Sequence, residues 1–218
     1  MTPRPLRYTA LIFDLDGTLI DSAPDMAAAV NTYFTVQGLP AQTTAYVERF
    51  IGHGPRRLLL DMFSDLQLPT DAASIDAAHT AFMAQYWQSP ARLTQFYPDV
   101  LADLNNLHAA GIALGLCTNK PQALTLRILE QMGMAPLFAA VVGADAVPAC
   151  KPNPGHLLAV AEIMRLEPGT WAYVGDSGID QATAQAAGVP FFLVPWGGGA
   201  RVMVEDGYRL TRLRDLVV

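Results

Sequence analysis

Short apolar segments alternate with helical patterns along most of this chain. Tyr8–Phe13 is apolar on both faces, as is typical of a buried strand in a parallel sheet. Between such segments apolar residues recur three or four positions apart, and glycine or proline marks the ends of the predicted helices. The further predicted strands are Ile112–Cys117, Ala139–Val142, Trp171–Val174 and Val189–Val194, with predicted helices around Leu101–Leu107, Leu124–Met132 and Leu157–Met164. This order predicts an α/β fold, a doubly wound, Rossmann-like parallel sheet.

One region interrupts this order, because it shows helical patterns and no convincing strand. The segment Ser22–Gln37 opens with Ser22 and Asp25 at the spacing of a capping box. A further short helix is expected at Tyr46–Ile51. The region has three apolar stripes at helical spacing: Met26, Val30, Tyr33 and Phe34; Leu59, Met62, Phe63 and Leu66; and Ile75, Phe82 and Tyr86. A helical insert after the first strand would lie over its carboxyl end, where open α/β sheets bind ligands. We expect a core domain of residues 1–19 and 93–218 with the catalytic site, and a helical cap of residues 20–92 as a substrate lid.

Composition narrows the class of protein. The 218 residues are 51% hydrophobic and 16% charged, which supplies a core and excludes wholesale disorder. A net charge of -6 argues against a nucleic-acid partner. Two cysteines, Cys117 and Cys150, are too few for a disulfide scaffold and fit a reducing compartment. No secretory signal is credible, and no apolar run reaches the ~20 residues of a membrane helix, so we expect a soluble, cytoplasmic protein without a membrane partner.

Two of the predicted strands end in acidic residues. Asp14 ends the first strand, and Asp16 follows two positions later. The strand at Trp171–Val174 runs into Asp176, and Asp180 follows about one helical turn later, so both carboxylates can share one side. Each cluster could also be turn or helix-cap chemistry. Two acidic strand ends in one sheet favour a functional site.

Both lysines of the chain also fall at predicted strand or helix ends. Thr118, Asn119 and Lys120 follow one strand and offer a hydroxyl, an amide and an ammonium group. Lys151 precedes the helix that begins near Pro154. A solvated surface lysine is the usual explanation for any single case. That explanation is weaker in a chain whose other strong cations are all arginines.

Charge arithmetic indicates what such a site would bind. Carboxylates of Asp14, Asp176 and Asp180 at ~4 Å would repel by about 4 kcal/mol per pair at an effective dielectric constant of about 20. The cluster therefore needs a cation or must take up protons. Ligand sets made only of oxygen favour magnesium over zinc, and magnesium shares its shell with water and phosphate. With Lys151 and Thr118 nearby, the predicted site suits a phosphate group.

These motifs resemble those of the haloacid dehalogenase superfamily. Their order and spacing match, and the resemblance covers essentially the whole chain. The four motifs are Asp14-Leu15-Asp16-Gly17-Thr18, Thr118-Asn119-Lys120, Lys151-Pro152-Asn153-Pro154 and Gly175-Asp176-Ser177-Gly178-Ile179-Asp180. Within the superfamily the sequence is most similar to bacterial phosphoglycolate phosphatases. The stretches that carry this likeness are Asp21–Asp25, Ile51–Gly54 and Thr118–Pro121.

The resemblance implies a phosphoric monoester hydrolase that works through an aspartyl phosphate. Asp14 would be the nucleophile, and Asp16 would protonate the leaving group and then activate water. Lys151 would restrain Asp14 and bind the phosphoryl group. Magnesium is the implied cofactor, held by Asp14, by the backbone carbonyl of Asp16 and by Asp176. Asp180 would support the metal through water or through Lys151.

The resemblance also implies how a small phosphorylated metabolite would bind. Thr118, Asn119 and Lys120 would contact it from the core. On the cap, the loop with His53 and Arg56 is the candidate contact, because a carboxylate-bearing substrate favours a positive partner. For the cap loop, an equally good interpretation is that Gly52 and Gly54 separate two helices, with the arginine solvated. These side chains are the predicted substrate-binding residues.

The substrate implied by the resemblance is 2-phosphoglycolate, cleaved to glycolate and phosphate by a monomer or homodimer. Asp16 is present where the family's dehalogenases replace it, which argues against dehalogenation. Trp196-Gly197-Gly198-Gly199 stands where phosphoglycolate phosphatases usually have an aromatic-Gly-Tyr turn. The alternatives are a sugar-phosphate mutase, a pyrophosphatase, or a non-catalytic protein that binds a phosphorylated metabolite.

Overall fold

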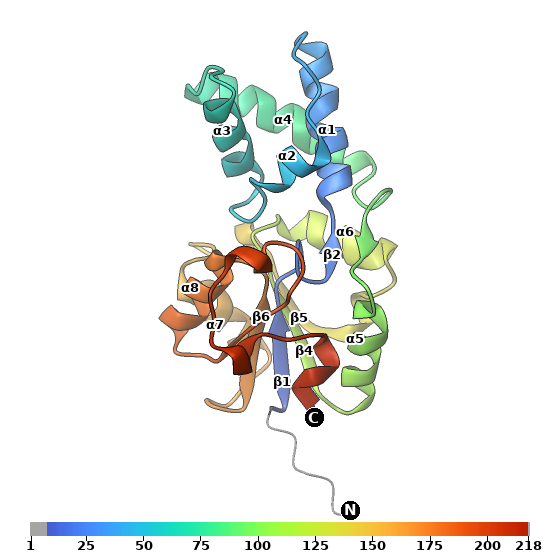
Figure 1. The fold of residues 1–218 in the computed structure, drawn as a ribbon, viewed down its shortest axis with the longest axis vertical. Coiled ribbons are helices and arrows are strands. Elements are labelled where there is room, and N and C mark those ends of the chain that lie inside the picture. Colours follow the sequence, from blue (N-terminus) through green and yellow to red (C-terminus); the bar gives the residue numbers. More distant parts are fainter. Residues whose placement is uncertain (1–7, 218) are drawn as a thin grey trace, which may run out of the picture. The chain divides into compact units, whose positions relative to one another are not determined.

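The computed structural model describes residues 8–217, and its central feature is a five-stranded parallel sheet in the order β5-β4-β1-β6-β7 (Figure 1). The strands are β1 (Ala10–Phe13), β4 (Ala113–Cys117), β5 (Phe138–Val142), β6 (Trp171–Gly175) and β7 (Phe191–Leu193). β1 lies in the middle and is fully buried, as its unbroken apolar sequence predicted. The predicted α/β fold with a parallel sheet is confirmed.

Helices cover both faces of this sheet. They are α5 (Val100–Ala109), α6 (Gln122–Gln131), α7 (Pro154–Ile163) and α8 (Gly178–Ala187). Helix α7 packs on β1, β4 and β5, and α8 packs on β6 and β7. In Figure 1, α5 lies on the side of the sheet away from α7 and α8. Short 3₁₀ helices are Ala135–Leu137, Ala144–Ala146, Gly199–Arg201, Asp206–Tyr208 and Leu213–Val217.

The chain reverses its direction across the sheet between β1 and β6. From β1 it proceeds outward through β4 to β5, and then returns to β6 on the other side of β1. Phe13 at the end of β1 pairs with Leu116 on one side and Val174 on the other. Because the strands are parallel, their carboxyl ends meet at one edge. Such a switch point is where open α/β sheets bind ligands.

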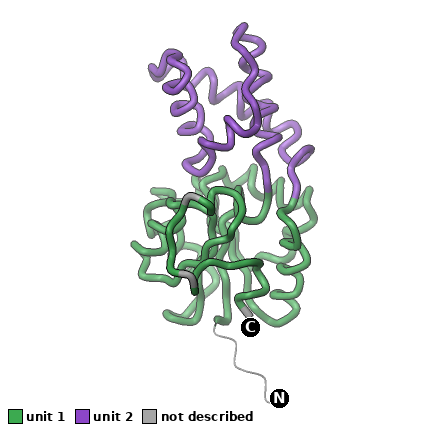
Figure 2. The backbone as a smooth tube through the Cα atoms, in the orientation of Figure 1, with its two compact units in different colours: residues 1–20, 96–218 green, residues 21–95 purple. Residues whose placement is uncertain are grey.

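The chain divides into two compact units, residues 1–20 with 96–218 and residues 21–95 (Figure 2). The cap predicted from the sequence, 20–92, begins one residue earlier and ends three residues earlier than the second unit. The expectation that this region lacks strands is wrong at its two ends. There β2 (Ile20–Asp21) and β3 (Gln95–Phe96) form a two-stranded sheet, and two residues are too few to show strand periodicity.

The second unit is helical. It consists of α1 (Ala23–Val36), α2 (Thr44–Glu48), α3 (Pro55–Asp65) and α4 (Ala72–Gln88). Helix α1 packs against α2 and α4, and α3 packs against α4. Phe34, Phe63 and Phe82 are buried, and the rings of Phe34 and Phe63 meet edge to face at 6.1 Å. The three predicted apolar stripes therefore supply this unit's own core.

The capping box predicted at the start of α1 is wrong. Ser22 occupies the N-cap position, but its side chain makes no capping hydrogen bond. The Asp25 carboxylate instead accepts bonds from the backbone N–H groups of Leu93, at 2.8 Å, and Thr94, at 2.7 Å. It also accepts a bond from the Thr94 hydroxyl at 2.7 Å. A buried carboxylate needs donors, and the returning chain provides better ones than the helix end does.

Among residues 8–217, no helix combines the length and the apolar character that a membrane span requires.

Candidate active site

The loops at the carboxyl edge of the sheet bring together chemical groups from distant parts of the sequence. Asp14 follows β1, and its backbone N–H donates to the carbonyl of Val174 in β6 at 2.9 Å. Thr118 follows β4, Asp176 follows β6, and Lys151 precedes α7. The strand ends predicted from the sequence are therefore neighbours in space.

Lys151 lies at the centre of this arrangement. Its Nζ is 2.8 Å from Asp14 Oδ1 and 2.7 Å from Asp180 Oδ1. The same atom donates to the Tyr173 hydroxyl at 2.9 Å. An ammonium group has three hydrogens, and here three oxygens receive them. With only 2% of the side chain exposed, these partners replace the water that would otherwise solvate the charge.

Asp180 both caps helix α8 and contacts Lys151 of the site. Its Oδ2 accepts from the backbone N–H of Ser177 at 3.1 Å and from the Ser177 hydroxyl at 2.5 Å, completing the capping box of α8. Its Oδ1 accepts from Lys151 and, at 2.8 Å, from the Tyr173 hydroxyl. The helix-cap interaction, which was the alternative interpretation of this motif, is therefore present. The same carboxylate also anchors the lysine.

Three carboxylates of the site could share a cation. One oxygen each of Asp14, Asp176 and Asp180 lies within 4.8 Å of the others, and all three residues are buried. Burial, with the charges of Asp180 and Asp176, raises the pKa of Asp14 to about 8 against the opposing effect of Lys151. Burial and Asp180 likewise raise the pKa of Asp176 to about 7. The donors are all oxygens, so the residues fit a hard divalent cation.

The other ionisable groups of this cluster keep defined charge states. Burial opposes the charge of Lys151, but Asp14 and Asp180 outweigh it and raise the pKa of the ammonium group. Burial also disfavours the Asp180 carboxylate, yet Lys151 holds the pKa of Asp180 below its usual value. Burial, reinforced by Asp180, raises the pKa of Tyr173, so its hydroxyl remains a donor.

Buried His156 fixes the backbone at Lys151. Its Nδ1 accepts from the backbone N–H of Lys151 at 3.2 Å, and its Nε2 lies 3.1 Å from the carbonyl of Val142. Because Nδ1 is an acceptor, the ring hydrogen belongs on Nε2, which donates to Val142. Burial lowers the pKa of His156 to about 4, consistent with this neutral form.

Lys120, the other lysine of the chain, contacts Asp16, the second aspartate of the first motif. Lys120 Nζ is 2.9 Å from Asp16 Oδ1 and 2.8 Å from Oδ2, with 2% and 11% of the two side chains exposed. The backbone N–H of Lys120 donates to Thr118 Oγ1 at 3.2 Å. Asn119 Nδ2 donates to the carbonyl of Lys151 at 3.0 Å, which joins two motif loops. Lys120 and Asn119, predicted to bind substrate, thus also hold the site together.

Several residues of the site had no role in the sequence analysis. Thr18 and Gly198 both donate to Asp176, Tyr173 contacts Lys151, and His156 braces its backbone. Thr18 was visible within the first motif. Tyr173 looked like one more apolar strand residue, and His156 like an ordinary helix residue, so their roles had no separate signal in the pattern.

The two predicted cap residues lie in the helical unit. His53 is exposed in the turn between α2 and α3, and Gly54 is the N-cap of α3, as the alternative interpretation had it. Arg56 Nε and Nη2 donate to Asp76 Oδ1 at 3.2 and 2.7 Å, and 53% of the arginine side chain is exposed. Their binding of substrate stays a prediction.

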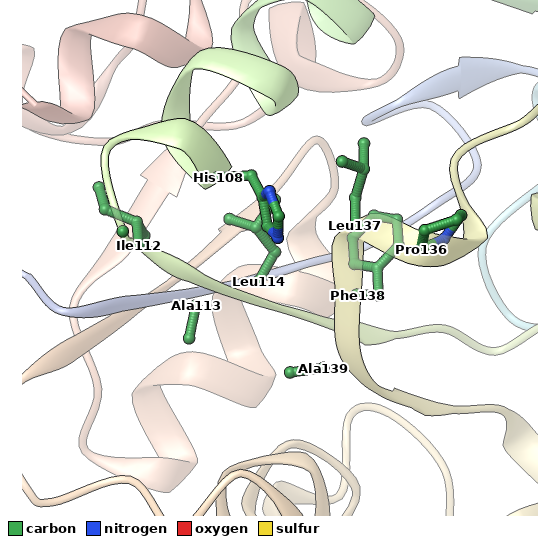
Figure 3. Close-up of a pocket in the computed structure, with 9 residues that line it drawn as sticks. His108, Ile112, Ala113, Leu114, Pro136, Leu137, Phe138 and Ala139 are labelled. Atoms are coloured by element: carbon green, nitrogen blue, oxygen red, sulfur yellow. The ribbon is translucent and has the colours of Figure 1, made fainter.

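Two cavities of the core lie at the other end of the strands. One of about 310 Å³ is lined by the end of α5 and the beginnings of β4 and β5, including His108, Ile112, Leu114 and Phe138 (Figure 3). The other, of about 340 Å³, lies beside α7 and α8 and includes Trp171 at the beginning of β6. Neither includes the charged groups at the carboxyl edge. Their linings are mostly apolar.

Comparison with known proteins identifies the family. A family model for haloacid dehalogenase-like hydrolases matches residues 11–194. The chain belongs to this family. A phosphoglycolate phosphatase of Cereibacter sphaeroides is 41% identical over 206 residues, which are 94% of this chain and 89% of that protein. One from Xanthomonas campestris is 37% identical over 188 residues, covering 86% and 83% of the two chains.

A solved structure supports the same assignment. It comes from Haemophilus somnus and is described as a predicted phosphoglycolate phosphatase. It is 25% identical, covers 98% of each chain and superposes with a TM-score of 0.86. The resemblance seen in the four motifs is therefore confirmed. This haloacid dehalogenase-like protein is a phosphoric monoester hydrolase.

Proposed function

We propose that this hydrolase is a magnesium-dependent phosphatase that cleaves 2-phosphoglycolate through an aspartyl phosphate on Asp14. The observation that carries the proposal is the buried contact of Lys151 with Asp14, beside Asp176, at the switch point of the sheet. The names of the relatives support the substrate. The helical unit is proposed to act as the lid.

In the first step, an oxygen of the Asp14 carboxylate attacks phosphorus while the ester P–O bond breaks. Asp16 donates its proton to the leaving alkoxide. Lys151 holds Asp14 in place and offers positive charge to the transferring oxygens. Thr118 accepts from the Lys120 backbone, so its own hydroxyl hydrogen is directed elsewhere and can serve a phosphoryl oxygen.

In the second step, Asp16 takes a proton from water. The water oxygen bonds to phosphorus, the bond between Asp14 and phosphorus breaks, and inorganic phosphate leaves. Both aspartates return to their starting states. The contact of Lys120 with both Asp16 oxygens keeps that carboxylate near the reaction in each step.

The cation would be held by Asp14, by Asp176 and by the backbone carbonyl of Asp16, with Asp180 supporting it through Lys151. When bound, it screens the repulsion between the carboxylate nucleophile and the phosphate dianion. With Asp14, Asp176 and Asp180 ionised, their three negative charges exceed the one positive charge of Lys151 by two, which one divalent cation would balance. This balance supports a divalent rather than a monovalent ion.

A substrate carboxylate would need a positive partner beyond these groups. Lys151 and Lys120 already contact aspartates of the site. The proposed partners are Arg56 of the helical unit, through its charge, and His53, as a hydrogen-bond donor. Arg56 can leave Asp76 at little cost, because exposed ion pairs contribute roughly 1 kcal/mol or less.

The substrate proposal is tested by phosphate release from 2-phosphoglycolate, p-nitrophenyl phosphate, a hexose phosphate and pyrophosphate, each with magnesium or EDTA. We expect 2-phosphoglycolate to have the highest kcat/KM and EDTA to abolish turnover. Isomerised hexose phosphate would indicate a mutase, and preferred cleavage of pyrophosphate a pyrophosphatase. Stabilisation by phosphoglycolate without turnover would indicate a binding protein.

The intermediate is tested by acid quenching during turnover, followed by peptide mass spectrometry. A phosphate should be found on the peptide that contains Asp14. Asp14→Asn should abolish both the phosphopeptide and turnover, whereas Asp61→Asn, at a half-buried residue of α3 that pairs with Arg57, should retain both. Normal hydrolysis of p-nitrophenyl phosphate by Asp14→Asn would exclude the proposed mechanism.

A further inference from the structure

The loop Trp196–Gly199, which follows β7, reaches the carboxylate of Asp176. The backbone N–H of Gly198 donates to Asp176 Oδ2 at 2.7 Å. The Thr18 hydroxyl donates to the other oxygen, Oδ1, at 3.1 Å. Each oxygen thus has its own donor, and together they fix the plane of the carboxylate.

Trp196 holds Thr18 in turn. Its Nε1–H donates to the carbonyl of Thr18 at 2.9 Å, and its ring stacks on Tyr97 at 5.7 Å with an angle of 22° between the planes. The loop therefore contacts Asp176 directly through Gly198 and indirectly through Thr18.

The glycines of the loop allow this close approach. Gly197 has a φ of +57°, and a Cβ there would overlap the carbonyl of Gly17 and lie 2.7 Å from Asp176 Oδ2. A Cβ on Gly198 would be 3.0 Å from the same oxygen. A side chain at either position would push against the carboxylate, so backbone without side chains is what the geometry requires.

The partners of Asp176 differ in kind from those of the other aspartates. Asp14, Asp16 and Asp180 each contact a lysine ammonium. Within residues 8–217, the side chain of Asp176 accepts hydrogen bonds from an amide and a hydroxyl, both neutral. Neutral donors orient a carboxylate without cancelling its charge, which leaves the charge of Asp176 for a cation.

We propose that the Trp196–Gly199 loop positions Asp176 for binding of the divalent cation, so that the loop determines metal affinity. This inference rests on the proposed function, because it takes Asp176 as a metal ligand. Trp196 and Gly198 are positioning residues that act through Asp176, and the outer partners of metal ligands commonly change affinity about 10- to 100-fold.

The decisive experiment measures Mn²⁺ affinity by electron paramagnetic resonance in Gly197→Ala and Gly188→Ala. Gly188 is the matched control, because its φ of +69° imposes similar strain but its Cβ would meet nothing within 4 Å. Gly197→Ala should weaken Mn²⁺ binding roughly 10- to 100-fold. Gly188→Ala should lose thermal stability through its backbone strain alone, yet bind Mn²⁺ like the wild type.

One further variant keeps the proposal testable. Trp196→Phe removes the Nε1 donor but keeps an aromatic ring against Tyr97, and should weaken binding about 3- to 10-fold. It decides the matter if Gly197→Ala does not fold. Wild-type affinity in folded Gly197→Ala, or in Trp196→Phe when the former is unfolded, would overturn the proposal.

Asp176→Asn separates this inference from the proposed function. If Asp176→Asn weakens Mn²⁺ binding and the loop variants do not, only the role of the loop is refuted. If Asp176→Asn binds Mn²⁺ like the wild type, the assignment of Asp176 as a ligand fails, and the role of the loop fails with it.

Discussion

Two ion pairs with the same distance between their charged groups lie in very different environments, one buried and one exposed. Lys151 Nζ and Asp180 Oδ1 are 2.7 Å apart at the edge of the sheet, as are Arg56 Nη2 and Asp76 Oδ1 in the helical unit. The side chains of the first pair are 2% and 0% exposed, and those of the second are 53% and 63% exposed.

This difference in exposure shows that the distance between two charges does not by itself give the energy of their interaction. Removing one partner of a buried pair leaves an unsolvated charge and costs about 3–5 kcal/mol. An exposed pair is screened by water and salt, and contributes roughly 1 kcal/mol or less. A buried pair adds little net stability over an apolar core. Its presence at the edge of the sheet therefore points to chemistry.

The largest effect is expected for Lys151→Met. Asp14 and Asp180 would lose their shared cation, so the free energy of unfolding should fall by about 3–5 kcal/mol. Activity should fall at least about 10²- to 10³-fold, because a group that stabilises transition-state charge is lost. Urea unfolding and p-nitrophenyl phosphate hydrolysis provide the two measurements. Adding Asp180→Asn to Lys151→Met should restore part of the stability and none of the activity. If the stability losses of the two single variants simply added, Lys151 and Asp180 would not be energetically coupled.

His156 should make the core less stable in acid. Its pKa is about 4 in the folded protein and about 6.5 when unfolded. Above pH 6.5 both states are neutral, so this residue gives no pH dependence. Between pH 6.5 and 4 only the unfolded state takes up this proton, so the contribution of His156 to stability falls by about 3 kcal/mol.

The test compares wild type with His156→Gln, which can still donate to Val142. Unfolding free energies measured from pH 7 to 4 should fall less steeply in the variant. His108→Gln, at an exposed histidine, should follow the wild-type profile. Parallel profiles for wild type and His156→Gln would contradict the assignment.

A smaller effect is expected for Tyr173→Phe. The hydroxyl takes the place of water around the buried Lys151–Asp180 pair, and a hydrogen bond to charged groups contributes about 1.5–3 kcal/mol. Stability should fall by roughly that amount, and kcat should fall more than KM changes, since Lys151 is mispositioned. An unchanged kcat in a destabilised enzyme would mean that the hydroxyl is only structural.

The smallest effect is expected at the exposed pair. A double-mutant cycle of Arg56→Ala and Asp76→Ala should give a coupling energy of roughly 0.5 kcal/mol or less that vanishes in 1 M salt. A coupling as large as that between Lys151 and Asp180 would remove the contrast between the two regions. If Arg56 binds the substrate carboxylate, Arg56→Ala should raise KM for 2-phosphoglycolate but not for p-nitrophenyl phosphate.

Much of the fold was predictable because its signals are local. The buried strand that ends at Phe13 shows in an unbroken apolar run, and Asp14 is visible as the residue that ends it. Lys120 and Lys151 were conspicuous because the chain otherwise uses arginine. Strands β2 and β3 were missed because pairing across some seventy residues, rather than two-residue sequences, creates them.

Short-range patterns were enough to predict which motif residues lie at the carboxyl edge, because strand ends and turns follow from such patterns. Which groups pair became clear only from the folded chain: Lys120 with Asp16 at that edge, and Asp25 with Leu93 and Thr94, rather than with Ser22, in the helical unit. The fold likewise brought Gly198 to Asp176 and Tyr173 to Lys151. Those choices depend on which buried charges and donors meet once water is excluded, and chain spacing does not encode that.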